Sequence, residues 1–355
     1  MLNQKILNHL YFFYFLNIIC GKIYIYQKIT IVIWPVESDF KKYTKNNDDV
    51  FHINKYIKIN CQYYNQIKKN GLKIMSETTK ILTIQDISCY GQCSITVALP
   101  IISAFGIETA ILPSAVLSTH TAGFTDFTVR DLTEDLPAIK EHWEKEEIYF
   151  DAIYTGFIAS IEQLDYIKDI IDSRLKPDGI VFVDPAMADH GEFYNGFDQE
   201  FADKMAELCK LGDYILPNTT EACYILHKPW KEEFTNEEML EMANELCEFT
   251  KKYVILKGDT HKENELGMIV LDKDESSAEI VYNDKIDYVS HGTGDVFASA
   301  FVGSTMLGKA PTSAAKIAGE FTKKAIEETI DDPTHTYGVR FERVIKDIQE
   351  LLKNY

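Results

Sequence analysis

Residues 289–299 read Val-Ser-His-Gly-Thr-Gly-Asp-Val-Phe-Ala-Ser, a polar turn with two glycines that runs directly into small and apolar residues. The spacing after Asp295 predicts a helix of small residues that begins at this turn. Glycine lets the backbone direct its N–H groups towards one point, and a helix start adds a partial positive charge there. The stretch therefore predicts an anion site formed by Gly292, Thr293 and Gly294.

Asp295, at the start of this helix, is open to two interpretations. It is a helix N-cap, which needs no ligand, or it is a general base that takes a proton from a hydroxyl while the amides of the turn hold a phosphate. The polar residues elsewhere in the chain favour the second interpretation.

The composition narrows the class of partner. The chain has 355 residues and a formal net charge of -19, which argues against nucleic acid and anionic membranes as partners. Its seven cysteines show no Cys-x-x-Cys pair and no zinc spacing, so we expect buried thiols in a reducing cytoplasm. Cys89 and Cys93 are expected near a site.

Residues 1–74 differ from the rest of the chain. They hold 11 Lys but only 4 Asp+Glu, and they contain neither Ala nor Arg. We interpret them as an atypical N-terminal extension, disordered or outside the native protein, that precedes a folded domain of residues 75–355 beginning at Met75. A targeting segment or anchor within residues 7–26, or a further real domain, remain alternatives.

Apolar runs alternate with helical patterns from residue 80 onward. Such runs predict an α/β fold, with a mostly parallel central sheet buried on both faces by helices. The expected strands are 80–85, 107–112, 115–117, 151–155, 180–183, 214–216 and 253–256, with an antiparallel pair at 266–271 and 279–282. The expected helices are 94–105, 131–146, 161–174, 201–211, 236–250 and 312–329.

Polar or aromatic residues follow the carboxyl ends of these strands. In an open parallel sheet that edge forms the ligand crevice, and Asp295 can face it. The residues are Asp86, His120, Phe157, Asp184, Asn218, Glu221 and Lys257.

Two of these residues form a candidate metal pair. Asp184 and Glu221 suit Mg²⁺, which takes one or two carboxylates together with phosphate and water oxygens. Alternatively Asp184 begins a plain turn, Asn218 and Glu221 form a capping box, and Lys257 is a solvated lysine rather than a phosphate ligand.

Residues 303–310 nearly match a phosphate-binding P-loop, but they lie in and after a predicted helix and end in Ala310, so we set that match aside.

Together the acids, the amide anion site, the lysine and the base are the groups that phosphoryl transfer requires. The motifs also resemble those of a known family. Gly292-Thr293-Gly294-Asp295 resembles the signature of the ribokinase-like kinases. Within them, the stretches 84–91, 118–121, 155–157, 183–185 and 217–221 resemble the pyridoxal/pyridoxine/pyridoxamine kinases, over about residues 79–330.

The resemblance implies a three-layer ribokinase-like sandwich and a phosphotransferase with an alcohol acceptor. It implies ATP and Mg²⁺, with Asp295 as base and residues 292–294 as anion hole. It places Asp184, Glu221, Asn218 and Lys257 around nucleotide and metal, and a pyridine ring near Asp86, Tyr90, His120 and Phe157. It also implies a cytoplasmic homodimer.

Three positions depart from the family pattern. Asp86 replaces a frequent serine, and an acid there pairs with a protonated ring nitrogen or marks a different substrate. Phe157 replaces a frequent tyrosine, and Lys257-Gly258 replaces a hydroxyl pair near the nucleotide.

The resulting hypothesis is an ATP-dependent kinase that phosphorylates the 5′-hydroxymethyl group of a vitamin B6 vitamer. The alternatives are a hydroxymethylpyrimidine kinase of thiamine synthesis and a non-catalytic vitamer- or nucleotide-binding protein. A sugar or nucleoside kinase is less favoured, because Phe157 and His120 do not suit several hydroxyl groups.

Overall fold

The computed structural model describes residues 78–355, except residues 122, 259–264, 276, 287 and 289. Residues Thr79–Tyr355 form one compact unit. The expectations for residues 1–74 and for a start at Met75 lie outside the described residues, and the division into an extension and a domain stays a prediction.

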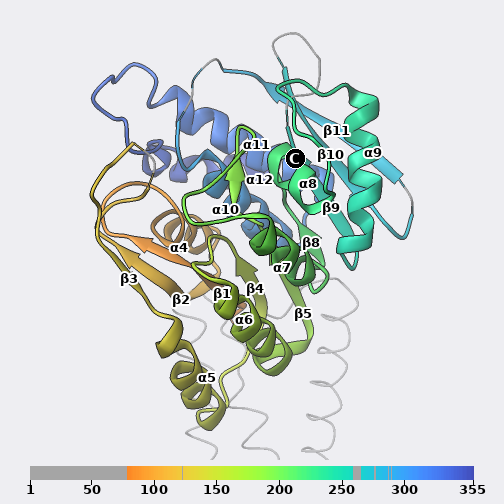
Figure 1. The fold of residues 1–355 in the computed structure, drawn as a ribbon. Coiled ribbons are helices and arrows are strands. Elements are labelled where there is room, and N and C mark those ends of the chain that lie inside the picture. The colour runs from red at the N-terminus through yellow and green to blue at the C-terminus, as the bar shows by residue number, and fades with distance from the viewer. Residues whose placement is uncertain (1–77, 122, 259–264, 276, 287, 289) are drawn as a thin grey trace, which may run out of the picture. The chain divides into compact units, whose positions relative to one another are not determined.

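A single large sheet organises the described residues (Figure 1). Its nine strands lie in the order β11-β10-β9-β8-β5-β4-β1-β2-β3. Strands β2, β1, β4, β5, β8 and β9 pair in parallel, while β3 and β10 run antiparallel to their neighbours. The predicted mostly parallel sheet is therefore confirmed. The strands are β1 (Lys80–Ser88), β2 (Glu108–Leu117), β3 (Val129–Asp131), β4 (Phe150–Thr155), β5 (Leu175–Val183), β8 (Tyr214–Ile215), β9 (Tyr253–Lys257), β10 (Glu265–Asp272) and β11 (Ser277–Asp284).

Helices cover both faces of this sheet, which confirms the three-layer prediction. Successive side chains of a strand point to opposite faces. In β5, Val181 and Val183 join one buried cluster and Phe182 joins the other. The first face carries α5 (Leu136–Lys145), α6 (Ile161–Arg174), α7 (Gln199–Cys209), α8 (Thr219–Ile225) and α9 (Asn236–Leu246). The second carries α4 (Ile95–Ala104), α10 (Thr293–Met306), α11 (Pro311–Glu327) and α12 (Ile348–Asn354).

Strand β1 carries an irregularity next to Asp86. The β1–β2 register shifts between Gln85 and Ile87, and Gln85 lies opposite Pro113. Proline has no N–H to give to a ladder, so it is tolerated where pairing is interrupted. The two strands predicted at 107–112 and 115–117 are consequently one strand, and that prediction was wrong.

Other boundaries also differ from the predictions. The helix predicted at 131–146 begins only at Leu136, because residues 129–131 form strand β3 and residues 133–135 a 3₁₀ turn. Pro137 lies in the first turn of the helix, where its missing N–H costs nothing. Helix α12 was not predicted.

Two local predictions are confirmed. Asn218 and Glu221 form a complete capping box at the start of α8. The near match to a P-loop lies inside and just after α10, where Gly308 has a φ of 85° and ends the helix. Within the described residues, none of the helices combines the length and apolar character that a membrane span requires.

Candidate active site

The parallel strands bring most of the predicted residues to one edge of the sheet. Asp86 lies near the end of β1, Asp184 directly follows β5, and Lys257 ends β9. Asn218 forms a parallel bridge with Lys257, so the loop after β8 is held next to β9. The carboxyl ends of parallel strands share one edge, which is where an open α/β sheet binds ligand.

The glycine turn before α10 has a conformation that other residues would strain. Gly292 is the N-cap residue with a φ of 76°, and a Cβ there would lie 2.0 Å from the Gln92 carbonyl oxygen. Gly294 is open, with no atom within 4 Å of the place of a Cβ. The first intrahelical bond runs from Val296 N to Gly292 O at 3.0 Å, so the amides of residues 292–295 are not used by the helix. These amides can hold an anion.

Asp295 is not the N-cap. It is the third residue of α10, and the helix start has no side-chain cap hydrogen bond. That alternative from the sequence is therefore wrong, and the carboxylate is available for chemistry.

The surroundings of Asp295 adjust its acidity. Burial raises the pKa of Asp295 to about 7, and the Asp184 and Asp86 carboxylates act in the same direction. A hydrogen bond from the Ser94 backbone and the charge of Lys257 oppose this rise. A carboxylate that titrates near neutral pH is matched to general base catalysis.

Asp184 and Lys257 form a buried ion pair. Lys257 Nζ lies 3.0 Å from Asp184 Oδ1, and the two side chains are 18% and 5% exposed. Burial works against the charge of Lys257, but Asp184 and Glu221 outweigh it and raise the pKa of the lysine. Burial also raises the pKa of Asp184. A second positive group next to this pair would stabilise the buried carboxylates.

Glu221 is committed largely to the backbone. Its Oε2 accepts from Asn218 N at 2.8 Å, and its Oε1 accepts from Met187 N at 3.4 Å. Burial raises the pKa of Glu221 well above its usual value, although the charge of Lys257 opposes this. Among the described residues, no cluster of three or more His, Cys, Asp or Glu side chains forms a metal site. One or two acids fit Mg²⁺ that takes most of its ligands from phosphate and water.

A second group of predicted residues lies around Asp86 and His120. Asp86 is buried, and its Oδ2 accepts from Ser88 Oγ at 2.9 Å. Burial raises the pKa of Asp86. His120 is also buried, and its backbone N–H donates to Tyr90 O at 3.2 Å. The Tyr90 ring is exposed, and the backbone bond to His120 holds the loop after β1 against the loop after β2.

Phe157 packs in another direction. Its ring lies 5.3 Å from the ring of Phe197, and its carbonyl accepts from Ser114 Oγ at 3.1 Å. Phe157 follows strand β4, and β4 is a neighbour of β1 in the sheet. Its expected contact with a ligand ring stays a prediction.

Several residues of the site were missed by the sequence reasoning. Ser94 has a φ of 53°, which is unusual for a residue with a Cβ. Its backbone hydrogen-bonds to Asp295, and its side chain hydrogen-bonds to Asp86. Cys93, in contrast, was expected near a site, and burial together with the charges of Asp295 and Asp86 raises the pKa of its thiol. Tyr337 contacts the site from near the C-terminus. The sequence pattern did not reveal Ser94 or Tyr337, because neither a positive φ nor a contact from a distant loop produces a periodic signal.

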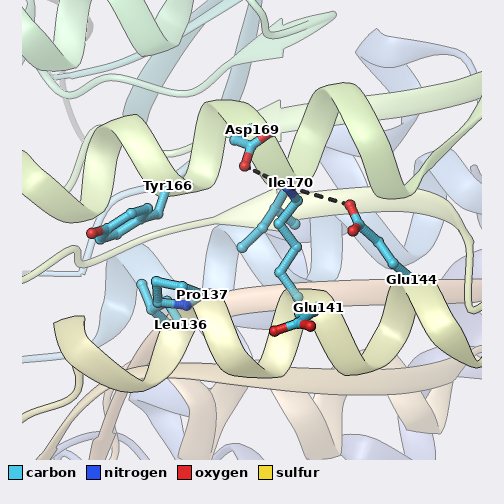
Figure 2. A pocket seen from close by; sticks show the side chains of 8 residues that line it. Leu136, Pro137, Glu141, Glu144, Tyr166, Asp169 and Ile170 are labelled. Atoms are coloured by element: carbon cyan, nitrogen blue, oxygen red, sulfur yellow. Dashed lines mark hydrogen bonds and ion pairs between the residues drawn. The ribbon is translucent and has the colours of Figure 1, made fainter.

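A separate pocket lies between α5 and α6 (Figure 2). Lys140 within it pairs with Asp169 at 2.5 Å and Glu144 at 3.3 Å. It shares no residue with the predicted site, and these charges already satisfy each other.

Comparisons with known proteins agree with this geometry. The phosphomethylpyrimidine kinase family model matches residues 99–339. The pyridoxine/pyridoxal/pyridoxamine kinase of Bordetella pertussis is 25% identical over 260 residues, covering 70% of this chain and 89% of that protein.

Solved structures are similar over most of their length. A Bacteroides thetaiotaomicron protein assigned as a phosphomethylpyrimidine kinase, in a crystal form with pyridoxal, is 33% identical with a TM-score of 0.74, covering 77% of this chain and 96% of that chain. The pyridoxal kinase of Lactobacillus plantarum is 26% identical with a TM-score of 0.72, covering 79% and 99%. The glycine turn, the acids at the sheet edge and the match over residues 99–339 lead to one conclusion: this chain belongs to the phosphomethylpyrimidine kinase family of the ribokinase-like kinases.

Proposed function

We propose that this chain transfers the γ-phosphoryl group of ATP to the 5′-hydroxymethyl group of pyridoxal, pyridoxine or pyridoxamine. The observation that carries the proposal is the position of Asp295. It lies at the start of α10 and has a pKa of about 7. The charges of both Asp184 and Asp86 contribute to raising this pKa. One carboxylate therefore borders both the expected ring site and the expected phosphate site.

In this mechanism Asp295 accepts the proton of the 5′-hydroxyl group. The oxygen of that hydroxyl group attacks phosphorus in line with the leaving ADP. The amides of Gly292, Thr293 and Gly294 stabilise the charge on the equatorial oxygens. Lys257, beside Asp184, adds a positive charge at the same edge. Asp184 and Glu221 would hold Mg²⁺, which supplies neutralisation of phosphate charge when it is bound.

Two features support a vitamer as the acceptor. Burial raises the pKa of Asp86, and a protonated pyridine nitrogen beside it would stabilise the charged form of this acid. In addition, a relative of this chain that is 33% identical was crystallised with pyridoxal.

Hydroxymethylpyrimidine is the second candidate acceptor, because the matching family model is that of phosphomethylpyrimidine kinase. The fold and the role of Asp295 would be unchanged. A non-catalytic binding protein is disfavoured, because such a protein has no need for a carboxylate adjusted to neutral pH.

The test is ADP release by the full chain with ATP and Mg²⁺, using the three vitamers and hydroxymethylpyrimidine in parallel. Turnover with a vitamer supports the proposal. Turnover with the pyrimidine alone would assign the second function, and vitamer binding without turnover would assign the binding protein.

The remaining features of the proposal follow from the family resemblance. We propose a homodimer that acts in the cytoplasm. Size-exclusion chromatography with light scattering would measure the oligomeric state of the full chain.

A further inference from the structure

The chain returns to the site after α11. The Tyr337 carbonyl oxygen accepts from Gln92 N at 2.8 Å and lies 3.2 Å from His120 Nε2. Since a carbonyl can only accept, His120 carries its proton on Nε2 and donates it there. The next carbonyl, that of Gly338, accepts from Ser290 Oγ at 3.1 Å. Two consecutive residues thus hold the loop after β1, the loop after β2 and the turn before α10.

The side chain of Gln92 fixes the same segment a second time. Its amide nitrogen donates to Glu342 Oε1 at 2.7 Å, and its amide oxygen lies 2.8 Å from His335 Nε2. Gly338 lies so close that a Cβ would be 2.4 Å from Gln92 Cβ, and its φ is 138°. Residue 338 therefore has no room for a side chain.

The ring of Tyr337 extends the aromatic surface near His120. It lies 4.8 Å from the Tyr90 ring, and the two hydroxyls hydrogen-bond, which raises the pKa of Tyr90. Phe124 lies 6.0 Å from Tyr90 and 5.0 Å from His120. Flat faces of this kind suit a flat heteroaromatic ligand.

The segment is also anchored on its outer side. Arg340 pairs with Asp332, and Arg340 N donates to Thr329 Oγ1 at 2.9 Å. The contacts to Gln92 and His120 are therefore made by a fixed turn.

We propose that Tyr337 and Gly338 complete the ring-binding site, with Tyr337 as the residue that positions His120 and Tyr90 against the acceptor. The inference rests on the proposed function, because it assigns these residues to the binding of the acceptor ring. It follows that changes at these residues weaken binding of the ring compound and leave ATP binding largely intact.

The experiment compares four variants of the full chain. Gly338→Ala introduces the clash with Gln92, and Tyr337→Ala removes the ring but keeps the carbonyl. Tyr337→Phe keeps the ring and serves as the conservative rescue. Gly308→Ala is the matched control, since Gly308 also has a positive φ of 85° but faces open space at the far end of α10.

For each variant we would measure Kd for pyridoxal without nucleotide, KM for ATP, kcat and Tm. We expect Gly338→Ala to raise the pyridoxal Kd by about tenfold or more. Tyr337→Ala should raise it about three- to tenfold, the range for one aromatic pair. Tyr337→Phe and Gly308→Ala should stay within about twofold, and KM for ATP should change by less than about threefold throughout.

The inference is overturned if neither Gly338→Ala nor Tyr337→Ala weakens pyridoxal binding more than Gly308→Ala does. It is also overturned if the ATP and pyridoxal constants change in parallel, since that indicates general loss of structure. Should Gly338→Ala fail to fold, Tyr337→Ala decides alone. The unmodified chain reports separately on the proposed function: if it accepts only hydroxymethylpyrimidine, the same comparison is made with that ligand, and if it binds no ring compound, both proposals fail.

Discussion

The role of Asp295 gives the sharpest prediction. Asp295→Ala removes the carboxylate that the proposal makes responsible for taking the acceptor proton. A positioned general base contributes about 10²–10⁴ in rate, so kcat should fall by that factor, or about 3–5 kcal/mol of transition-state stabilisation. ATP binding should persist, because the proposed anion site consists of backbone amides of residues 292–294, which this substitution keeps.

The pH dependence tests the same carboxylate without a mutation. Only the deprotonated form of Asp295 can accept a proton, so kcat/KM should rise with pH, with a midpoint near pH 7. With that pKa, about a tenth of the groups are ionised at pH 6 and half at pH 7, so the rate should differ about fivefold. The Asp295→Asn variant should lose this dependence together with its activity.

Neighbouring charges should displace the pH profile in opposite directions. Lys257→Met removes a positive charge that lowers the pKa of Asp295, so the midpoint should move to higher pH. Asp86→Asn removes a negative charge that raises it, so the midpoint should move to lower pH.

The assay is initial-rate ADP release between pH 5.5 and 8.5, with nucleotide binding and Tm measured on each variant. Activity of Asp295→Ala within a few-fold of the unmodified chain would refute the assignment of the base. A flat profile between pH 6 and 8, with chemistry rate-limiting, would refute the assigned pKa.

Three further predictions concern stability, selectivity and chain length. Gly292→Ala should destabilise the protein by about 1–3 kcal/mol in urea unfolding, because of its positive φ and its approach to Gln92; a loss no larger than that of Gly308→Ala would contradict this reason. Asp86→Ser should change the ratio of kcat/KM values among the vitamers more than it changes KM for ATP, and an unchanged ratio would remove Asp86 from the ring site. A chain that starts at Met75 should keep kcat within about twofold of the full chain in the same assay, and loss of activity with a folded domain would give residues 1–74 a role.

Much of the fold could be predicted because buried parallel strands have a plain sequence signal. Both faces of such strands are apolar, as in residues 180–183 of β5 and 254–256 of β9, and short apolar runs between helices indicate them directly. The boundaries were less predictable. Two strands were predicted at 107–112 and 115–117, whereas one strand spans both, with Pro113 opposite Gln85 where the β1–β2 register shifts.

For the site, the sequence by itself determined the short local motifs. The capping box of Asn218 and Glu221 and the glycine turn before α10 depend on residues three or four apart, so they can be recognised in one dimension. The order of the parallel strands then placed Asp86, Asp184 and Lys257 at one edge.

Only the tertiary structure decided how these groups interact. The pKa of Asp295 depends on burial and on the charges of Asp184, Asp86 and Lys257. The Lys257–Asp184 pair joins residues 73 positions apart. Tyr337 reaches His120 across 217 positions through a backbone carbonyl, an atom that every residue carries. Such contacts arise from packing between distant segments, and no local pattern of residue types encodes them.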